Sequence, residues 1–187
     1  AEVGSPRVVI GGRSAGGNLA LATVLRARDE GLPPPAGLVL LSPEVDLTEA
    51  GDSFRTNLGL DVNLPGSLMR ANLLYAGGAD LAHPYLSPLF GSFGEDFPLT
   101  FIQSGTRDLM LSNAVRLHRA LRDADAQAEL HVFEAMPHGG FGGTPEDQAL
   151  SREIAGFVAR ALAGAASPCP AAPYTREPAG PNPEDHA

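Results

Sequence analysis

The chain has 187 residues, 43% hydrophobic and 19% charged, which is enough for one globular domain with its own core. Its 13 basic residues stand against 22 acidic ones, a net charge of −9, which excludes the basic surface that nucleic acids and anionic membranes require. We therefore expect a small-molecule partner, no nucleic acid and no membrane. One cysteine, no visible signal peptide and no apolar run of membrane-spanning length favour a cytoplasmic location.

Apolar runs alternate along the chain with segments of helical spacing. We expect strands at residues 7–11, 37–41, 99–104 and 129–133, and helices at 16–30, 66–75, 112–124 (with Ser112 as N-cap) and 145–163. Strands that alternate with helices form parallel βαβ units, and strands that are apolar throughout are covered on both faces. The fold class is therefore α/β, with a mostly parallel sheet of about four strands flanked by helices.

The chain divides by composition into a body and a tail. Residues 1–163 carry the α/β pattern and are expected to form the catalytic domain. Residues 164–187 are rich in Pro and Ala, and we expect this tail to be disordered because it has few large apolar side chains to bury.

A serine among glycines directly follows the first expected strand. Gly12-Arg13-Ser14-Ala15-Gly16 matches G-x-S-x-G, in which a sharp strand-to-helix turn exposes the serine Oγ above the sheet. Small neighbours are expected because the strand and the helix pass close together, and free N–H groups at a helix N-terminus favour developing negative charge. A glycine-rich turn such as a phosphate loop is the alternative. The strand–turn–helix context favours Ser14 as a nucleophile, with the Ala15 backbone N–H as oxyanion donor.

A serine nucleophile needs a base, and in a parallel sheet catalytic groups gather beyond the carboxyl ends of the strands. Among the histidines, only His138 lies in a loop directly past an expected strand. The others lie in an irregular segment, a helix, a strand and the tail: His83, His118, His131 and His186. Position therefore makes His138 the predicted base.

The orienting acid follows from the same rule. Asp108 lies just past the third strand, and the alternatives Asp46 and Glu44 lie past the second. The chain order Ser14, Asp108, His138 is the order of an α/β-hydrolase triad. We therefore predict a catalytic triad of these three residues, without a cofactor or a metal ion.

Two further motifs invite other interpretations. Residues 51–54 contain a G-D-S block, but it follows an acidic loop instead of a strand, so a turn is the better interpretation. Residues 138–141 resemble the HGGG-type oxyanion motif, which belongs upstream of the nucleophile. We assign this second motif to the loop that contains His138, called the histidine loop below.

Several blocks together resemble the hormone-sensitive-lipase-like (family IV) carboxylesterases of the α/β-hydrolase fold. They are residues 12–20, Leu41-Ser42-Pro43-Glu44-Val45-Asp46-Leu47-Thr48, Gly105-Thr106-Arg107-Asp108 and Met136-Pro137-His138, and the similarity runs from about residue 5 to 163. The resemblance implies hydrolysis of carboxylic esters, commonly short-chain acyl esters, without a cofactor. Arg13 departs from the family, which usually has Asp at that position, so local charge and substrate preference are expected to differ.

A second departure concerns the segment before Ser14. The family places several strands, the HGGG loop and an N-terminal cap there, and residues 1–6 cannot contain them. The first strand is then expected to have an open edge through which copies self-associate. Two hypotheses follow: a portion of a longer serine esterase, or a truncated homologue that retains the triad with little activity and acts, if at all, as an interaction module. Amide or carbamate hydrolysis by the same triad stays open.

Overall fold

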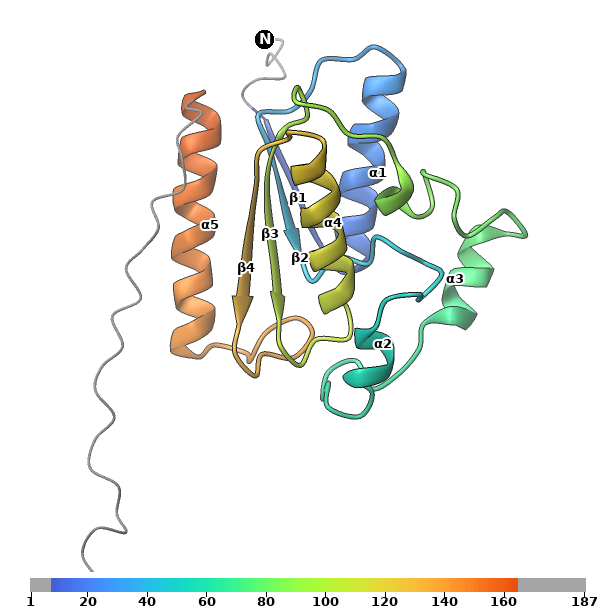
Figure 1. Ribbon diagram of the computed structural model, residues 1–187. Coiled ribbons are helices and arrows are strands. Elements are labelled where there is room, and N and C mark those ends of the chain that lie inside the picture. Colours follow the sequence, from blue (N-terminus) through green and yellow to red (C-terminus); the bar gives the residue numbers. More distant parts are fainter. Residues whose placement is uncertain (1–7, 165–187) are drawn as a thin grey trace, which may run out of the picture.

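The computed structural model describes residues 8–164 and contains one sheet of four parallel strands in the order β1-β2-β3-β4 (Figure 1). The strands are β1 (Val9–Arg13), β2 (Gly37–Leu41), β3 (Leu99–Gly105) and β4 (Ala128–Phe133). They alternate with α1 (Ala15–Asp29), α4 (Leu111–Asp123) and α5 (Pro145–Ala163). The expected α/β class and the parallel four-stranded sheet are confirmed.

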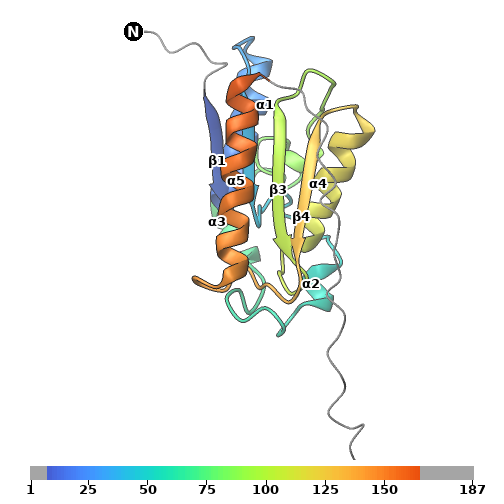
Figure 2. The same ribbon diagram turned by 90° about the vertical axis from the view of Figure 1, so that its left-hand side faces the viewer.

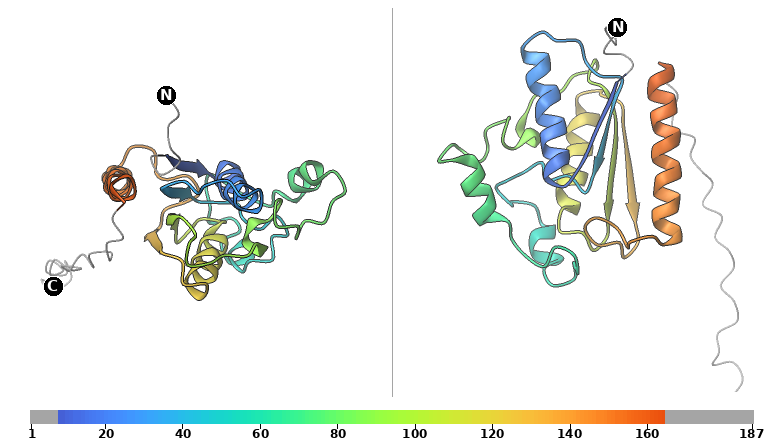
Figure 3. Two further views of the ribbon diagram at one scale, coloured as in Figure 1. Left: turned by 90° about the horizontal axis from the view of Figure 1, so that it is seen from above. Right: turned by 180° about the vertical axis from the view of Figure 1, so that it is seen from behind.

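Helices cover both faces of the sheet. Helices α1 and α4 pack on one face and α5 packs alone on the other, which is seen most clearly from above (Figure 3, left). Alternate residues of each strand serve the two layers: Leu38 and Leu40 of β2 face α1 and α4, and Val39 faces α5. The inner strand β2 is apolar throughout and almost fully buried, whereas the edge strands β1 and β4 are only partly buried and β4 contains Glu129 and His131.

The long connection between β2 and β3 holds more structure than the sequence predicts. It contains α2 (Ser53–Thr56), α3 (Met69–Ala76) and the 3-10 turn η2 (Pro88–Phe90), where the sequence predicts a single helix. Asn72 is the one buried residue of α3, so this helix has no apolar stripe by which a sequence pattern could fix its bounds.

The predicted N-cap of α4 is wrong. Met110 occupies that position, and Ser112 is the second residue of the helix itself. The Ser112 hydroxyl accepts a hydrogen bond from the Ser53 N–H at 2.8 Å, while the Ser53 hydroxyl accepts one from the Ser112 N–H at 2.9 Å. Ser112 therefore joins α4 to α2 instead of capping α4.

Strand β1 lies at the edge of the sheet, with β2 as its one neighbour among residues 8–164 (Figure 2). Its outer backbone groups are unpaired within that range. Over the same range, no helix combines the length and the apolar character needed to cross a bilayer. Of the predicted disordered tail all but Gly164 lies outside the described residues, as do residues 1–7 of the predicted catalytic domain.

Candidate active site

Ser14 occupies the turn between β1 and α1 in a backbone conformation that L-residues rarely adopt. Its φ is 53° and its ψ −124°. The end of β2 and the segment after it hold this strained turn, because the Ser14 N–H donates to the Leu41 carbonyl at 3.0 Å and the Ser14 carbonyl accepts the Glu44 N–H at 3.2 Å. Such strain costs of order 1–3 kcal/mol and is typical of functional sites.

The glycines around Ser14 differ in their structural importance. A Cβ on Gly12 would lie 2.1 Å from the Gly16 carbonyl oxygen, and one on Gly17 would lie 2.9 Å from Pro43 Cβ. A Cβ on Gly16 would meet nothing within 4 Å. The expectation that the turn requires small neighbours therefore holds for Gly12 and Gly17 but fails for Gly16.

His138 and Asp108 lie together at the carboxyl edge of the sheet. His138 Nδ1 is 3.0 Å from Asp108 Oδ1, and Asp108 is fully buried. The loop after β3 can approach the histidine loop because Gly105 has no side chain: a Cβ there would lie 2.0 Å from the Met136 carbonyl oxygen.

The Asp108 carboxylate is surrounded by donors. Oδ1 accepts the Met110 N–H at 2.8 Å, and Oδ2 accepts the Ser104 hydroxyl at 2.8 Å. Burial acts to raise the pKa of Asp108, but hydrogen bonds from His138 and Ser42 and the charge of His138 hold it below its ordinary value. Asp108 is therefore ionised at neutral pH and able to orient the imidazole and stabilise its protonated form.

A second buried carboxylate, Asp61, bonds to the backbone of His138. Its two oxygens accept the His138 N–H at 3.2 Å each, and its Oδ2 also accepts the Leu109 N–H at 2.8 Å. Its Oδ1 accepts the N–H groups of Asn63 and Leu64 from its own loop. Asp61 thereby connects the loop that contains Asp108 to the loop that contains His138.

Two asparagines of the same segment extend this support. Asn57 Nδ2 donates to the Thr106 and Asp108 carbonyls at 3.2 and 2.8 Å. Asn63 Nδ2 donates to the His138 and Gly140 carbonyls at 2.9 and 3.1 Å. Sequence reasoning missed Asn57, Asp61 and Asn63 because they lie in an irregular stretch and bond to backbone groups distant along the chain.

Arg13 joins the turn that contains Ser14 to the loop that contains His138. Its Nη1 donates to the Gly139 carbonyl at 2.7 Å. Between the described residues Ser14 and His138 themselves no hydrogen bond is formed. Catalytic hydrogen bonds often form only when substrate binds, so the lack of this bond is compatible with a serine–histidine pair.

The alternative acids have other roles. Asp46 accepts hydrogen bonds from Thr48 and from Arg116 Nη1, which is 2.5 Å from Asp46 Oδ2. Glu44 is buried but makes no hydrogen bond to a histidine in the described part of the chain. The Ser53 hydroxyl donates to the Leu109 carbonyl at 2.6 Å, in accord with a structural turn.

One group of side chains within residues 8–164 has the spacing of a metal site. Atoms of Asp61, Asp108 and His138 lie within 4.8 Å of one another. Their oxygens already accept the N–H and O–H donors described above, which occupy the lone pairs that a cation would use. We therefore assign this group to the hydrogen-bond network of the site.

Comparison with known proteins decides the family. Residues 1–141 match the family described as alpha/beta hydrolase fold. The chain belongs to this family. An acetyl-hydrolase of Streptomyces hygroscopicus is 34% identical over 140 residues, covering 73% of this chain and 46% of the relative. An esterase of Acinetobacter venetianus is 31% identical over 131 residues, covering 69% and 43%.

Solved structures agree with this assignment. An esterase crystal structure superposes with a TM-score of 0.79 at 38% identity, covering 83% of this chain and 49% of the other. A hormone-sensitive lipase from a metagenome library gives a TM-score of 0.77 at 32% identity, covering 84% and 54%. The predicted hormone-sensitive-lipase-like α/β hydrolase is thus confirmed, and the chain spans about half the length of these relatives.

Proposed function

We propose that this chain carries the nucleophile, base and acid of a serine carboxylesterase that acts on short-chain acyl esters. The Asp108–His138 pair carries the proposal, because it lies at the same sheet edge as the strained Ser14 and is joined to that turn through Arg13. The names of the relatives, esterase and acetyl-hydrolase, support ester hydrolysis.

The geometry suggests the usual two-step reaction. Ser14 Oγ attacks the ester carbonyl carbon while His138 Nε2 takes the hydroxyl proton, and Asp108 stabilises the resulting imidazolium through Nδ1–H. The oxyanion accepts a hydrogen bond from the Ala15 N–H, which has no partner within the helix because it lies in the first turn of α1. The intermediate expels the alcohol, which takes the proton from His138. Water then releases the carboxylic acid from Ser14 by the same steps.

Labelling with a fluorophosphonate tests this proposal. The probe should phosphonylate Ser14, because an assembled turn and base activate its hydroxyl; peptide mapping by mass spectrometry locates the label. Ser14→Ala should abolish labelling, and Ser53→Ala should retain it because the Ser53 hydroxyl is buried and bonded to a carbonyl. Labelling that persists in Ser14→Ala would contradict the assignment.

A second hypothesis is a homologue that has the triad but little activity. A folded chain that fails to label at Ser14 would support it. A substrate panel of esters, amides and carbamates separates ester hydrolysis from other acyl transfers. A cytoplasmic location stays a prediction from the sequence.

A further inference from the structure

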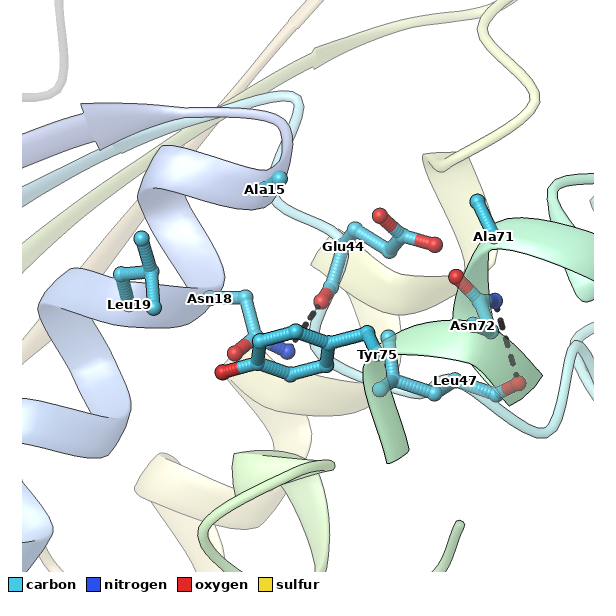
Figure 4. A pocket seen from close by; sticks show the side chains of 8 residues that line it. All are labelled: Ala15, Asn18, Leu19, Glu44, Leu47, Ala71, Asn72 and Tyr75. Carbon is cyan, nitrogen blue, oxygen red and sulfur yellow. Dashed lines mark hydrogen bonds between the residues drawn. The ribbon is translucent and has the colours of Figure 1, made fainter. Parts of the chain in front are cut away.

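A pocket of about 200 Å³ opens beside the Ala15 turn. It lies between the start of α1, the segment after β2 and helix α3 (Figure 4). Most of its wall is apolar, with Leu19, Leu47 and Tyr75 among the lining residues. Drug-sized ligands occupy pockets of about 300–1,000 Å³, so this one suits a chain of a few atoms.

The carboxyl group of Glu44 interrupts this apolar wall. Glu44 is only 4% exposed, and its Oε1 has no hydrogen-bond partner within residues 8–164. The Asn18 amide gives both of its N–H groups to carbonyls, those of Glu44 and Leu86. The Asn72 amide gives one N–H to the Leu47 carbonyl and also acts on the Glu44 carboxyl as a hydrogen-bond donor. Glu44 Oε1 is thus left without a donor among the described residues, whereas both oxygens of Asp61 and of Asp108 accept hydrogen bonds.

An under-bonded buried carboxyl destabilises the fold, because burial removes water without supplying replacement donors. Burial and the negative charge of Glu49 raise the pKa of Glu44 above its ordinary value, while a hydrogen bond from Asn72 and the charge of His138 act in the opposite direction. The triad leaves this group without a role, since His138 pairs with Asp108. A pocket wall beside a nucleophile is where a buried acid without donors can serve a ligand.

We propose that Glu44 is a specificity-determining residue that binds a primary ammonium group on the acyl chain of the ester. The inference rests on the proposed function, because the pocket adjoins the turn that holds Ser14. An ammonium supplies the missing N–H donors together with the opposite charge, while the apolar wall contacts the methylene groups of the chain. A carboxylate on the same chain would be repelled by Glu44.

Matched acyl esters test the preference. p-Nitrophenyl 3-aminopropanoate and p-nitrophenyl butanoate have acyl chains of equal length, and differ by an ammonium in place of a terminal methyl. In Glu44→Gln, the ratio of kcat/KM for the first ester to that for the second should fall about 10–100-fold, because a charged hydrogen bond is lost. Glu95→Gln, at an exposed glutamate, should leave the ratio as in the wild type. An unchanged ratio in Glu44→Gln overturns the inference.

A binding measurement separates this inference from the proposed function. Titration with n-propylammonium chloride should shift the amide NMR signals of Leu47 and Asn72 in the wild type, and the shifts should vanish in Glu44→Gln. If wild-type protein shows these shifts but hydrolyses neither ester, the proposed function fails and the ammonium site stands. If the protein hydrolyses the esters but its amide signals do not shift even at the highest soluble concentration of n-propylammonium, the ammonium site is refuted.

Discussion

Replacing Asp61 by Asn should weaken the fold and the histidine loop together. The buried carboxylate accepts N–H groups from Asn63, Leu64, Leu109 and His138. Asparagine keeps one acceptor oxygen and turns the other position into an N–H₂ donor, which would face N–H groups that cannot accept. Each buried donor left unsatisfied costs about 1–3 kcal/mol. With one to two donors affected, we expect a loss of about 2–4 kcal/mol in the free energy of unfolding.

Differential scanning calorimetry measures the first effect. A chain of this length loses about 2–4 °C in Tm per kcal/mol, so Asp61→Asn should lower Tm by roughly 5–15 °C. Asp52→Asn is the matched control, because Asp52 is exposed in the same connection and its side chain caps nothing. A Tm no lower than that of the control would refute the reasoning.

A second measurement shows whether Asp61 positions the base. Well below Tm, the rate of fluorophosphonate labelling at Ser14 should fall at least about tenfold in Asp61→Asn, since displacement of a catalytic group by about 1 Å can cost about 100-fold in rate. Labelling at the wild-type rate in a destabilised Asp61→Asn protein would show that Asp61 acts on stability alone.

Four shorter predictions follow from the turn, the pocket and the sheet edge. Gly12→Ala should prevent folding or soluble expression, whereas Gly16→Ala should change Tm little, because only the first clashes with backbone; equal Tm values would contradict this. Ser14→Gly should be about 1–2 kcal/mol more stable to urea than Ser14→Ala, because only glycine relieves the positive φ, and identical unfolding midpoints would argue against strain. The raised pKa of Glu44 favours its protonated form in the fold, so this contribution to stability is present at low pH and lost as pH rises through that pKa; Glu44→Gln should therefore raise Tm at pH 8 more than at pH 4.5. The open edge of β1 should make the chain self-associate, and Val8→Lys should reduce this by placing a charge beside the edge; a monomer of wild-type protein in light scattering would refute the edge prediction.

The elements that the sequence predicts best carry their own boundary signals. Helix α5 spans the predicted residues 145–163 because Thr144 and Asp147 form a capping box, Pro145 begins the helix and Gly164 ends it in the left-handed conformation. Asp108 and His138 were predictable as candidates for a similar reason, since each lies in the loop that follows a strand of the parallel sheet, β3 and β4 respectively. The Asp108–His138 contact agrees with that prediction, although the triad as a unit stays a prediction.

Asp61 and the Glu44 pocket follow from no such local signal. Two of the four donors to Asp61, the N–H groups of Leu109 and His138, lie 48 and 77 positions away along the chain. The pocket wall depends on where α3 packs, and that helix buries a single residue, Asn72. The role of such side chains can be recognised only from the three-dimensional structure, because it depends on backbone groups that are distant along the chain.

Arg13 shows how a departure from the family pattern acquires a physical role. Its guanidinium donates to the Gly139 carbonyl, which an aspartate at this position could not do, because a carboxylate only accepts. On the opposite side, Asp61 accepts the His138 N–H and Asn63 donates to the carbonyls of His138 and Gly140. The histidine loop is therefore held from the nucleophile turn and from the connection after β2. Both attachments hold the loop that contains His138, so we expect substitutions at Arg13 or Asn63 to displace the imidazole and to slow the proposed chemistry.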